Sequence, residues 1–542
     1  MITSHNPKQS FIVLILLSLL LAGCRDQGSE GHKTAEDSTP RDLQITAADI
    51  AGNFSSQSAL KIDSSLLDSF FTQYPLLRSS RKSAGSFYRG RNFSLAWHDS
   101  VGLIEQAGSL LNRMQNVQAE GLSLQVPYLS AADSLMSNED PSDRRSLTQT
   151  DLLLTSMYFY FAEKVWGGLS EASVREINWY LPRKKINYEA RLDSLLRVPV
   201  GSSEPGEPVY RQYGLLKKAL EKYKAIANAN EWPVIVTNKR SFSKGDSADA
   251  IAIIKKRLYL LGDMAAISET PIFDSALLAA VNKFRRRFGM KETGIIDQPL
   301  INELNVPLKK RIEQIIVNIE RSRWLPDQME GDYIAVNIPG FRLHVCRGDS
   351  LLWSMNVVVG KTANKTVIFS GNLQYVVFSP YWNVPTSILN KEVLPGIRRD
   401  KNYLAKHHME WNGKSVRQKP GPWNSLGQVK FLFPNSYSIY LHDTPSKSLF
   451  SEDKRAFSHG CIRVGEPAKL ARYLLQNEAL WTDKKIDAAM NSGKEQYVTL
   501  KQPVPVLIGY LTAWVDLRHE GELNFRKDVY GRDGRLAKML EK

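Results

Sequence analysis

Cysteine is scarce in this sequence: its 542 residues include three, Cys24, Cys346 and Cys461. So few cysteines exclude the multi-disulfide framework that stabilises many small exported domains. A single bridge between Cys346 and Cys461 stays open, although it would consume both thiols. The fold must therefore depend on hydrophobic cores, and the chain is long enough for roughly two to four domains.

The N-terminal region has an apolar run, but this run is too short to span a membrane. Phe11–Gly23 is about 13 residues long, whereas a helix that crosses a bilayer needs about 20. Its length is typical of a signal-peptide core, and Lys8 supplies a basic start. The run ends in Leu21-Ala22-Gly23-Cys24, which resembles a lipobox.

We therefore expect residues 1–24 to be a lipoprotein signal peptide with Cys24 as the lipidation site. More than one acyl chain on Cys24 would anchor the protein stably to a membrane. The protein would then lie in the cell envelope, in the periplasmic space. The alternative is an ordinary signal peptide in which Cys24 is coincidental, and the sequence does not choose between inner and outer membrane.

Acidic residues are outnumbered, since 56 Asp and Glu stand against 71 Lys and Arg, for a net charge of +15. A basic chain favours an anionic partner, which can be nucleic acid, anionic lipid or an acidic cell-wall polymer. Charge alone does not choose among these. An exported protein points to the envelope, so we expect no nucleic-acid partner.

The first half of the chain is expected to be helical. Residues 25–46 are polar and predict a flexible tether, and residues 47–235 show the apolar spacing of a helical scaffold domain. The stretch Asp151–Leu169 should be a buried helix that ends at Gly167-Gly168. We interpret the tryptophans of this domain as core residues rather than as a ligand platform: Trp97, Trp166 and Trp179.

Residues 243–305 form a compact helical unit of their own. One apolar stripe closes at Gly262-Asp263, and a second helix opens at Phe273-Asp274. The two stripes are Ile251, Ile254, Leu258 and Leu261, then Leu277, Val281, Phe284 and Phe288. Arg285–Arg287 are expected on the outer face of the second helix, as a solvated face or as a contact for an anionic wall polymer.

The apolar period changes after residue 309. A helix over Arg311–Arg323 is followed by alternating runs that predict strands. The expected strands are Tyr333–Ile338, Phe341–Cys346, Leu351–Val359, Tyr375–Phe378 and Ser438–Leu441. Helical stretches return near 387–406 and 466–476. Residues 309–515 should therefore be a β-rich domain, residues 516–542 a C-terminal extension, and the chain a multidomain α+β protein.

Two short segments carry candidate chemistry. His442 ends an expected strand, and Ser458-His459-Gly460-Cys461 follows after fifteen intervening residues. A cysteine is a useful nucleophile only as the thiolate, which needs a base or a positive field nearby. Gly460 permits a tight turn, and N–H groups there could form an oxyanion pocket. Spacing alone is a moderate signal, because a lone cysteine with a distant histidine is more often inert.

The segment from His442 to Cys461 resembles the active-site signature of the L,D-transpeptidases with a YkuD-type catalytic domain. Arg417–Gly427 and Asn318–Pro326 are similar to segments of the large YcbB-type subfamily. Residues 243–305 resemble the small three-helix peptidoglycan-binding domain, with an unrelated helical linker domain as the alternative. The resemblance implies a scaffold, a peptidoglycan-binding domain and a catalytic domain in the order inferred above.

The resemblance also implies roles for single residues. Cys461 would be the nucleophile and His442 the general base, while the amides around Gly460 and Cys461 would serve the oxyanion. Arg463 stands where many members have Asn, so its hydrogen-bonding role is open. His459 would shape the pocket, and its assignment as the base is the alternative. Further expected site residues are Ser458 and Tyr440 in the pocket, and Arg417, Asn424 and Gly427 for substrate binding.

The implied reaction is acyl transfer between peptidoglycan stem peptides. Cys461 would attack the third residue of a tetrapeptide donor, release D-alanine and pass the acyl group to a diamino-acid acceptor, which gives a 3→3 cross-link. Covalent inhibition by carbapenem-type β-lactams is expected at the same thiol. The family needs no metal and no other cofactor, and the adjacent His407 and His408 lack the i, i+4 spacing of a ligand pair.

Residues 386–415 lie where the subfamily carries a capping insertion over the active site. They are rich in basic side chains: Lys391, Arg398, Arg399, Lys401 and Lys406. The segment is either a solvated helix face or a mobile lid that binds anionic stems and excludes water.

Two other functions stay open from the sequence. A cysteine hydrolase, such as an L,D-carboxypeptidase, shares the first half-reaction and gives the acyl group to water. A non-catalytic wall-binding lipoprotein would keep the fold without the chemistry. The presence of His442, Gly460 and Cys461 together argues against this second alternative.

Overall fold

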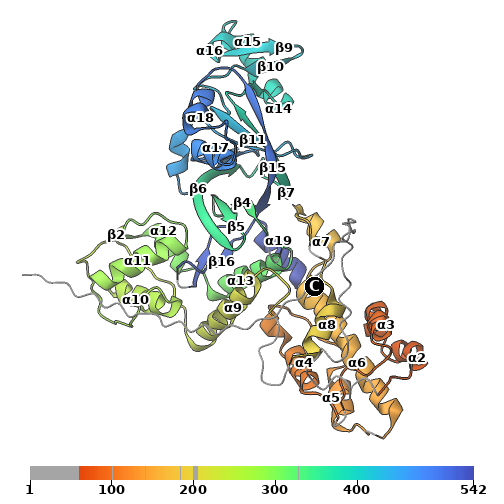
Figure 1. Cartoon of the computed structure of the whole chain (residues 1–542). Helices are drawn as coiled ribbons and strands as arrows, with labels where there is room; N and C mark the ends of the chain where they lie inside the picture. Colours follow the sequence, from red (N-terminus) through yellow and green to blue (C-terminus); the bar gives the residue numbers. More distant parts are fainter. Residues whose placement is uncertain are drawn as a thin grey trace, which may run out of the picture. The chain divides into compact units, whose positions relative to one another are not determined.

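The computed structural model describes residues 60–99, 102–140, 142–183, 185–198, 206–326, 329–519 and 521–541 (Figure 1). The expected signal peptide over 1–24, its lipidation site Cys24 and the expected tether over 25–46 lie outside these residues. Among the described helices, none is both long enough and apolar enough to cross a membrane. The described chain has a helical region, a small helical unit and a β-rich domain, so the predicted multidomain α+β class is confirmed.

Helices make up the region before residue 230. Its elements are α2 (Leu66–Gln73), η2 (Pro75–Ser80), α3 (Arg81–Gly90), α4 (Glu105–Gln115), η3 (Val117–Glu120), α5 (Leu129–Ser137), α6 (Arg144–Ala162), η4 (Glu163–Gly167), α7 (Glu171–Glu176), α8 (Tyr188–Leu196) and α9 (Gln212–Ala229). The tryptophans expected in the core, Trp97, Trp166 and Trp179, are 0%, 3% and 2% exposed, so that interpretation is confirmed.

The predicted buried helix is α6 with its continuation η4. It begins at Arg144, earlier than the predicted Asp151, because the Asp143 carboxylate caps the first turn by accepting from the Arg145 N–H. The predicted end at Gly167-Gly168 is confirmed. Gly168 ends the helix with a φ of 64°, and a Cβ there would collide with the Glu320 carboxylate.

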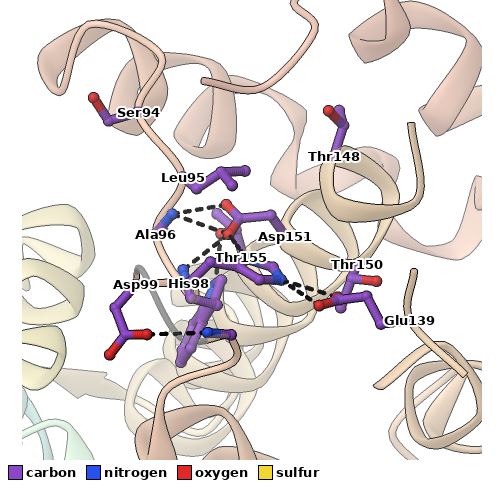
Figure 2. A network of polar contacts seen from close by, with 12 residues as sticks. Ser94, Leu95, Ala96, His98, Asp99, Glu139, Thr148, Thr150, Asp151 and Thr155 are labelled. Atoms are coloured by element: carbon purple, nitrogen blue, oxygen red, sulfur yellow. Dashed lines mark hydrogen bonds and ion pairs between the residues drawn. The ribbon is translucent and has the colours of Figure 1, made fainter. Parts of the chain in front are cut away.

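A buried polar network fixes α6 to the segment before α4 (Figure 2). The Asp151 carboxylate accepts hydrogen bonds from the N–H groups of Ala96 and Trp97 at 2.8 to 3.0 Å. The ring of His98 lies between two carboxylates, with Nδ1 3.0 Å from Asp151 Oδ2 and Nε2 2.9 Å from Glu139 Oε2. Both ring nitrogens therefore face acceptors, which suits a doubly protonated imidazolium.

The small helical unit contains α10 (Asp249–Leu261), α11 (Ser275–Arg287) and α12 (Gln298–Leu304), with β2 (Ser241–Phe242) paired to β3 (Ile296–Asp297). Both predicted apolar stripes are buried. Gly262 closes α10 with a φ of 83°, and the Asp274 carboxylate caps α11 by accepting from the Leu277 N–H at 2.8 Å.

The prediction that Arg285–Arg287 share an outer face is wrong. Arg285 and Arg287 are both 3% exposed. Arg285 donates to the Ile295 carbonyl at 2.9 Å, and Arg287 Nε donates to Asp263 at 2.6 Å. Consecutive helical residues are about 100° apart, so three in a row cannot share one face. Only Arg286 is partly exposed, and it pairs with Glu522 at 3.1 Å.

After α13 (Leu308–Arg323), strands form a mixed sheet whose path runs β7-β11-β12-β14-β6-β5-β4-β15 and returns through β15 to β7. The sheet therefore closes on itself around a hydrophobic core. Its strands are β4 (Asp332–Asn337), β5 (Arg342–Arg347), β6 (Ser350–Gly360), β7 (Ile368–Phe378), β11 (Val429–Leu432), β12 (Leu441–His442), β13 (Ala456–Ser458), β14 (Ile462–Val464) and β15 (Gln496–Gly509). Helices α17 (Pro467–Leu475) and α18 (Asp483–Met490) and the short η6 (Lys447–Ser451) complete the domain.

The predicted strand Ser438–Leu441 begins too early. Ser438 has a φ of 54°, which belongs to the left-handed region and not to a strand. The Asn435 side chain holds this bend, because its amide donates to the Ile439 carbonyl and its oxygen accepts from the Ile439 N–H. The strand β12 is thereby restricted to Leu441 and His442.

Two segments from outside the predicted catalytic boundaries, β1 and the C-terminal α19, contribute to the core of the barrel domain, whereas the buried residues of the β16–β17 hairpin belong to the core of the helical regions. The short β1 (Trp179–Tyr180) pairs in parallel with β7, and Trp179 packs edge-on against Trp324 at 5.1 Å between ring centroids. Beyond β15, the hairpin of β16 (Ala513–Asp516) and β17 (Glu522–Phe525) leads to α19 (Asp533–Leu540). This hairpin straddles the predicted boundary between residues 515 and 516.

The region of the expected capping insertion forms a sub-domain with its own small core. It contains α14 (Thr386–Ile388), η5 (Leu389–Val393), α15 (Leu394–Arg399) and α16 (Tyr403–Lys406), beside a three-stranded sheet of β8 (Trp382–Asn383), β10 (Ser415–Gln418) and β9 (Met409–Asn412). The core residues are Val384, Leu389, Val393 and Val416. We call residues 382–418 the capping sub-domain.

Candidate active site

The candidate site is built on the pairing of two short strands. β12 and β14 run in parallel, with Leu441 opposite Ile462 and His442 opposite Arg463. Leu441 and Ile462 are fully buried and face the core. Side chains alternate along a strand, so their neighbours face the opposite side. That side receives Tyr440, His442, Cys461 and Arg463.

The turn before β14 depends on Ser458 and Gly460. The Ser458 hydroxyl donates to the Cys461 carbonyl at 2.6 Å and accepts from the Gly460 N–H at 3.1 Å. Gly460 has a φ of 122°, which an L side chain rarely adopts. The turn therefore needs glycine for its backbone conformation, as the sequence predicts.

The same hydrogen bond changes the expected oxyanion site. The Gly460 N–H is engaged by Ser458, so it is not a free donor as the sequence analysis expected. Within the described residues no acceptor is given for the N–H of Cys461. The Cys461 amide is thus the backbone donor left available beside the thiol.

Cys461 lies in a partly buried position with a neutral thiol. Its Sγ is 3.6 Å from the Ser438 carbonyl oxygen. Burial raises the pKa of the Cys461 thiol above its usual value, while hydrogen bonds from Tyr440 and the charge of Arg463 oppose that rise. Neither Cys461 nor Cys346 is in a disulfide. Both thiols are therefore free, and Cys461 is mainly protonated at neutral pH.

His442 is oriented by the backbone. The ring is buried, and Nδ1 donates to the Asp443 carbonyl at 2.5 Å, which leaves Nε2 as the acceptor. Burial lowers the pKa of His442 to about 3, with a further decrease from the charge of Arg463. The imidazole is therefore neutral and able to accept a proton. Among the described residues the structure gives no hydrogen bond between this ring and Cys461 Sγ.

Tyr440 and Arg463 lie beside the nucleophile and the base. The Tyr440 ring is 5.6 Å from the His442 ring between centroids. Burial and the neighbouring Cys461 raise the pKa of the Tyr440 phenol, so it stays a hydrogen-bond donor. In the described part of the chain Arg463 has no ion pair, and its Nε is buried without an acceptor. A positive charge thus stands beside the thiol, although burial lowers the pKa of Arg463.

His459 points to a different neighbour. Its side chain is 47% exposed, and Nε2 is 3.9 Å from the Glu392 carboxylate of η5. The contact joins the turn of the nucleophile to the capping sub-domain. The structure gives His459 no contact with Cys461 or His442, so it does not favour His459 as the base.

The three residues expected to bind substrate are engaged in contacts within the protein. Asn424 is fully buried, and its amide donates to three backbone carbonyls while its oxygen accepts from the Leu426 N–H. Gly427 has a φ of 63°, and a Cβ there would collide with the Asp443 carboxylate. Both residues therefore shape the loop, and their role toward substrate stays a prediction. Arg417 is partly exposed and pairs with Glu410 at 2.7 Å within the capping sub-domain.

Two contributors were not foreseen from the sequence, the carbonyls of Asp443 and Ser438. The first orients the base and the second contacts the thiol. Both are backbone atoms, which every residue type offers, so the sequence contains no signal for them.

No metal site accompanies these residues: in the described ranges no three His, Cys, Asp or Glu side chains are grouped to hold an ion. His407 follows the last turn of α16, and His408 stacks on Trp423 at 3.9 Å between ring centroids. Both histidines are exposed, as expected for surface or cap residues.

Family comparisons cover most of the described chain. Residues 331–504 match the family model of the L,D-transpeptidase catalytic domain (YkuD), and residues 82–220 match a scaffold domain. Residues 247–304 match the model described as "Putative peptidoglycan binding domain". The three matches follow one another in the order that the resemblance implies: scaffold, peptidoglycan-binding and catalytic domain.

A Haemophilus influenzae protein named "Putative L,D-transpeptidase" is 33% identical over 245 residues, which are 41% of this chain and 49% of that protein. The chain therefore spans about half the length of this curated relative. Among solved structures, an L,D-transpeptidase from Mycobacterium smegmatis covers 33% of this chain and 58% of its own, at 14% identity and a TM-score of 0.19. L,D-transpeptidase 1 of Mycobacterium tuberculosis covers 33% and 62%, at 15% identity and a TM-score of 0.18.

Proposed function

We propose that the protein is a peptidoglycan L,D-transpeptidase that forms 3→3 cross-links through a thioester on Cys461. The observation that carries the proposal is the register of β12 and β14, which puts the thiol, a neutral imidazole and a guanidinium on one face of the sheet. This face belongs to a domain that matches an L,D-transpeptidase catalytic domain. The loop and entrance segments, Arg417–Gly427 and Asn318–Pro326, support membership of the YcbB-like subfamily.

The first half-reaction consumes the tetrapeptide donor. As the donor carbonyl approaches, Nε2 of His442 takes the Sγ proton and the sulfur attacks the carbonyl carbon of the third residue. The Cys461 N–H lies beside the sulfur and is placed to donate to the resulting oxyanion. The imidazolium then gives its proton to the departing amine, so D-alanine leaves and an acyl thioester remains.

The second half-reaction transfers the acyl group. The side-chain amine of a diamino acid on a neighbouring stem attacks the thioester, and His442 accepts the proton that this amine loses. Collapse of the intermediate expels the thiolate, which recovers the proton from His442. One peptide bond breaks and one forms, so the two half-reactions balance.

The opposite pKa shifts of the pair support proton transfer within the attack itself. A thiol with a raised pKa and an imidazole with a lowered pKa favour the neutral pair over a thiolate–imidazolium pair. The Asp443 carbonyl on Nδ1 stabilises the imidazolium once it forms. The nucleophile is thereby generated only when an acyl donor is present.

Replacing Cys461 with alanine tests the proposal. In cells or with isolated peptidoglycan, Cys461→Ala should abolish 3→3 dimers in fragments analysed by mass spectrometry. Cys346→Ala is the matched control, because Cys346 is the other described cysteine and lies on β5. Loss of shortened stems alone would make the protein a hydrolase. An unchanged fragment profile would make it a wall-binding protein and contradict the proposal.

We further propose that the protein is held in the envelope by a lipid on Cys24. A lipobox-like end of a short apolar run supports this localisation. A Cys24→Ser variant should lose incorporation of labelled palmitate and leave the membrane fraction. Retention of the label would refute lipidation at this cysteine.

A further inference from the structure

The turn that carries Cys461 is tied to a second buried loop through one threonine. Thr366 lies in the loop between β6 and β7 and is fully buried. Its hydroxyl donates to the Gly460 carbonyl at 2.8 Å and accepts from the Gly360 N–H at 2.9 Å. The N–H of Lys361 donates to the Ser458 carbonyl at 2.9 Å, which gives the two loops a second tie.

The loop of Thr366 is in turn held by Tyr530, which lies in the expected C-terminal extension. The Tyr530 hydroxyl donates to the Gly360 carbonyl at 2.6 Å and accepts from the Thr366 N–H at 3.2 Å. The Tyr530 N–H donates to the Tyr510 hydroxyl at 2.8 Å, and that hydroxyl donates to Asp528 at 2.5 Å. A chain of buried hydrogen bonds thus runs from the segment before α19 to the Gly460 carbonyl.

The Gly460 carbonyl matters because it belongs to the same peptide unit as the Cys461 N–H. A peptide unit is planar and trans, so its C=O and N–H point in opposite directions. A hydrogen bond that fixes the carbonyl therefore fixes the direction of the Cys461 N–H as well. Gly460 has no side chain and a φ of 122°, so its own backbone preference is weak.

We propose that Thr366 and Tyr530 are positioning residues that hold the Gly460–Cys461 peptide plane and so aim the Cys461 N–H at the oxyanion of acyl transfer. The proposal rests on the proposed function, because it assumes that Cys461 attacks an acyl group. Neither side chain contacts the substrate. Thr366 acts directly on the peptide plane, and Tyr530 acts by holding the backbone of Thr366.

Two reactions of the Cys461 sulfur distinguish a role in positioning the Cys461 N–H from a general role in stabilising the fold. Acylation of Cys461 by imipenem passes through a tetrahedral oxyanion, whereas alkylation by iodoacetamide does not. Loss of an oxyanion donor commonly lowers a rate by about 10²- to 10³-fold, and misdirection of the donor should cost about tenfold or more by the same reasoning. Both rates can be followed by intact-protein mass spectrometry in a Cys24→Ser, Cys346→Ala background, so that each adduct reports on Cys461.

We expect Thr366→Val and Tyr530→Phe to lower the acylation rate by about tenfold or more, while the alkylation rate stays close to that of the parent. Thr366→Ser keeps the hydroxyl and should restore acylation. Tyr473→Phe is the matched control, because it removes a tyrosine hydroxyl that donates to Asp332 at 2.5 Å and contacts neither loop.

Unchanged acylation in Thr366→Val would overturn the proposal. A parallel fall of acylation, alkylation and melting temperature would overturn it too, because that pattern means a structural role. Absence of any acylation in the parent protein would also overturn the proposal, because it would show that Cys461 does not attack an acyl group. If the parent is acylated but forms no 3→3 dimers, the proposed function fails while the positioning role is still decided by the variants.

Discussion

At the scale of single residues, the surroundings of Cys461 and His442 keep both groups uncharged. Burial raises the pKa of the thiol and lowers the pKa of the imidazole to about 3. Separated charges in a buried site cost more than a neutral pair unless a partner compensates them. Cys461 is therefore protonated before substrate binds, unlike the cysteine of enzymes that hold a preformed thiolate–imidazolium ion pair.

The pH dependence of alkylation checks this description. In a Cys24→Ser, Cys346→Ala background, the iodoacetamide rate of Cys461 should rise about tenfold per pH unit from pH 7 to pH 9 without a plateau, because only the thiolate reacts. The His442→Gln variant should show the same slope, since a neutral ring sets no second titration in this range. A plateau below pH 8 would contradict the description, because it would mean a stable thiolate–imidazolium pair.

His98 provides a residue-scale prediction away from the site (Figure 2). Burial alone would lower its pKa, but the hydrogen bonds and charges of Asp151 and Glu139 outweigh this and raise it. A pKa raised on folding gives stability that is fully present below the unfolded value of about 6.5 and is lost as pH rises through the folded value.

The amides of Ala96 and Trp97, which donate to Asp151, should therefore lose hydrogen-exchange protection as pH rises above neutrality, after correction for intrinsic exchange. A His98→Gln variant, whose side chain carries no titrating proton, should show a flat protection profile over the same range. Equal pH profiles for the two proteins would show that the charge on His98 does not hold this segment.

At the scale of elements, the spacing of apolar residues correctly predicted the helices and strands that bury one face in a hydrophobic core. The stripes of α10 and α11 and the alternation in β4, β5 and β6 fall where the pattern placed them. The apolar pattern gave a wrong prediction where a single side-chain contact determines where a strand begins or whether a residue is buried. The Asn435 amide shortens β12, and the carboxylate of Asp263 draws Arg287 into the interior.

The same distinction explains the candidate site. Cys461 and His442 could be predicted as a pair because acyl transfer through a cysteine needs a thiol and a base, and the pairing of β12 with β14 brings the two segments together. Asn424 and Gly427 were assigned to substrate because sequence likeness does not separate a residue that binds a ligand from one that shapes the loop. Asn424 fills its hydrogen-bonding capacity with backbone groups, and only the packed structure shows this.

The capping sub-domain gives an element-scale prediction. Its basic side chains Arg398 and Arg399 are exposed, and Glu392 of η5 contacts His459 of the nucleophile turn. If this sub-domain binds anionic stems, the double change Arg398→Glu and Arg399→Glu should lower turnover of polymeric peptidoglycan several-fold and leave imipenem acylation unchanged. Each reversed charge near a bound carboxylate costs on the order of 1 kcal/mol in water.

The matched control reverses two exposed basic residues of α19, Arg535→Glu and Lys538→Glu. It makes the same change in net charge outside the capping sub-domain. Equal turnover of the two double variants would contradict a role of the capping sub-domain in substrate binding. Arg398 and Arg399 would then be no more than a solvated face.

At the scale of the whole molecule, the domain borders in the sequence do not coincide with the borders of the cores. Val174, Ile177, Trp179 and Leu181 lie within the helical region in sequence but belong to the hydrophobic core of the barrel domain. Arg532 donates to the Ile177 carbonyl from the C-terminal side. The barrel domain is thus completed by residues from both sides of the segment 309–515.

This arrangement predicts an unusual cost for a residue remote from the catalytic segment. Trp179→Ala should destabilise the barrel domain by about 3–5 kcal/mol, the usual cost of truncating a buried aromatic side chain. Calorimetry of the full chain should show the unfolding transition of the barrel domain at a lower temperature. This transition can be recognised because Cys461 becomes accessible to alkylation as the domain unfolds. Trp411→Ala, at a tryptophan that is 52% exposed, should leave that transition unmoved. An equal shift in the two variants would contradict the shared core.

The neutral state of the Cys461 thiol also affects how readily oxidants react with it. Peroxides convert thiolates, not thiols, to sulfenic acid, and further oxidation of that species is irreversible. A raised pKa therefore shields Cys461 from peroxide at neutral pH. In the proposed mechanism His442 removes the proton only when an acyl donor arrives, so the thiol would stay protected from peroxide until the substrate binds.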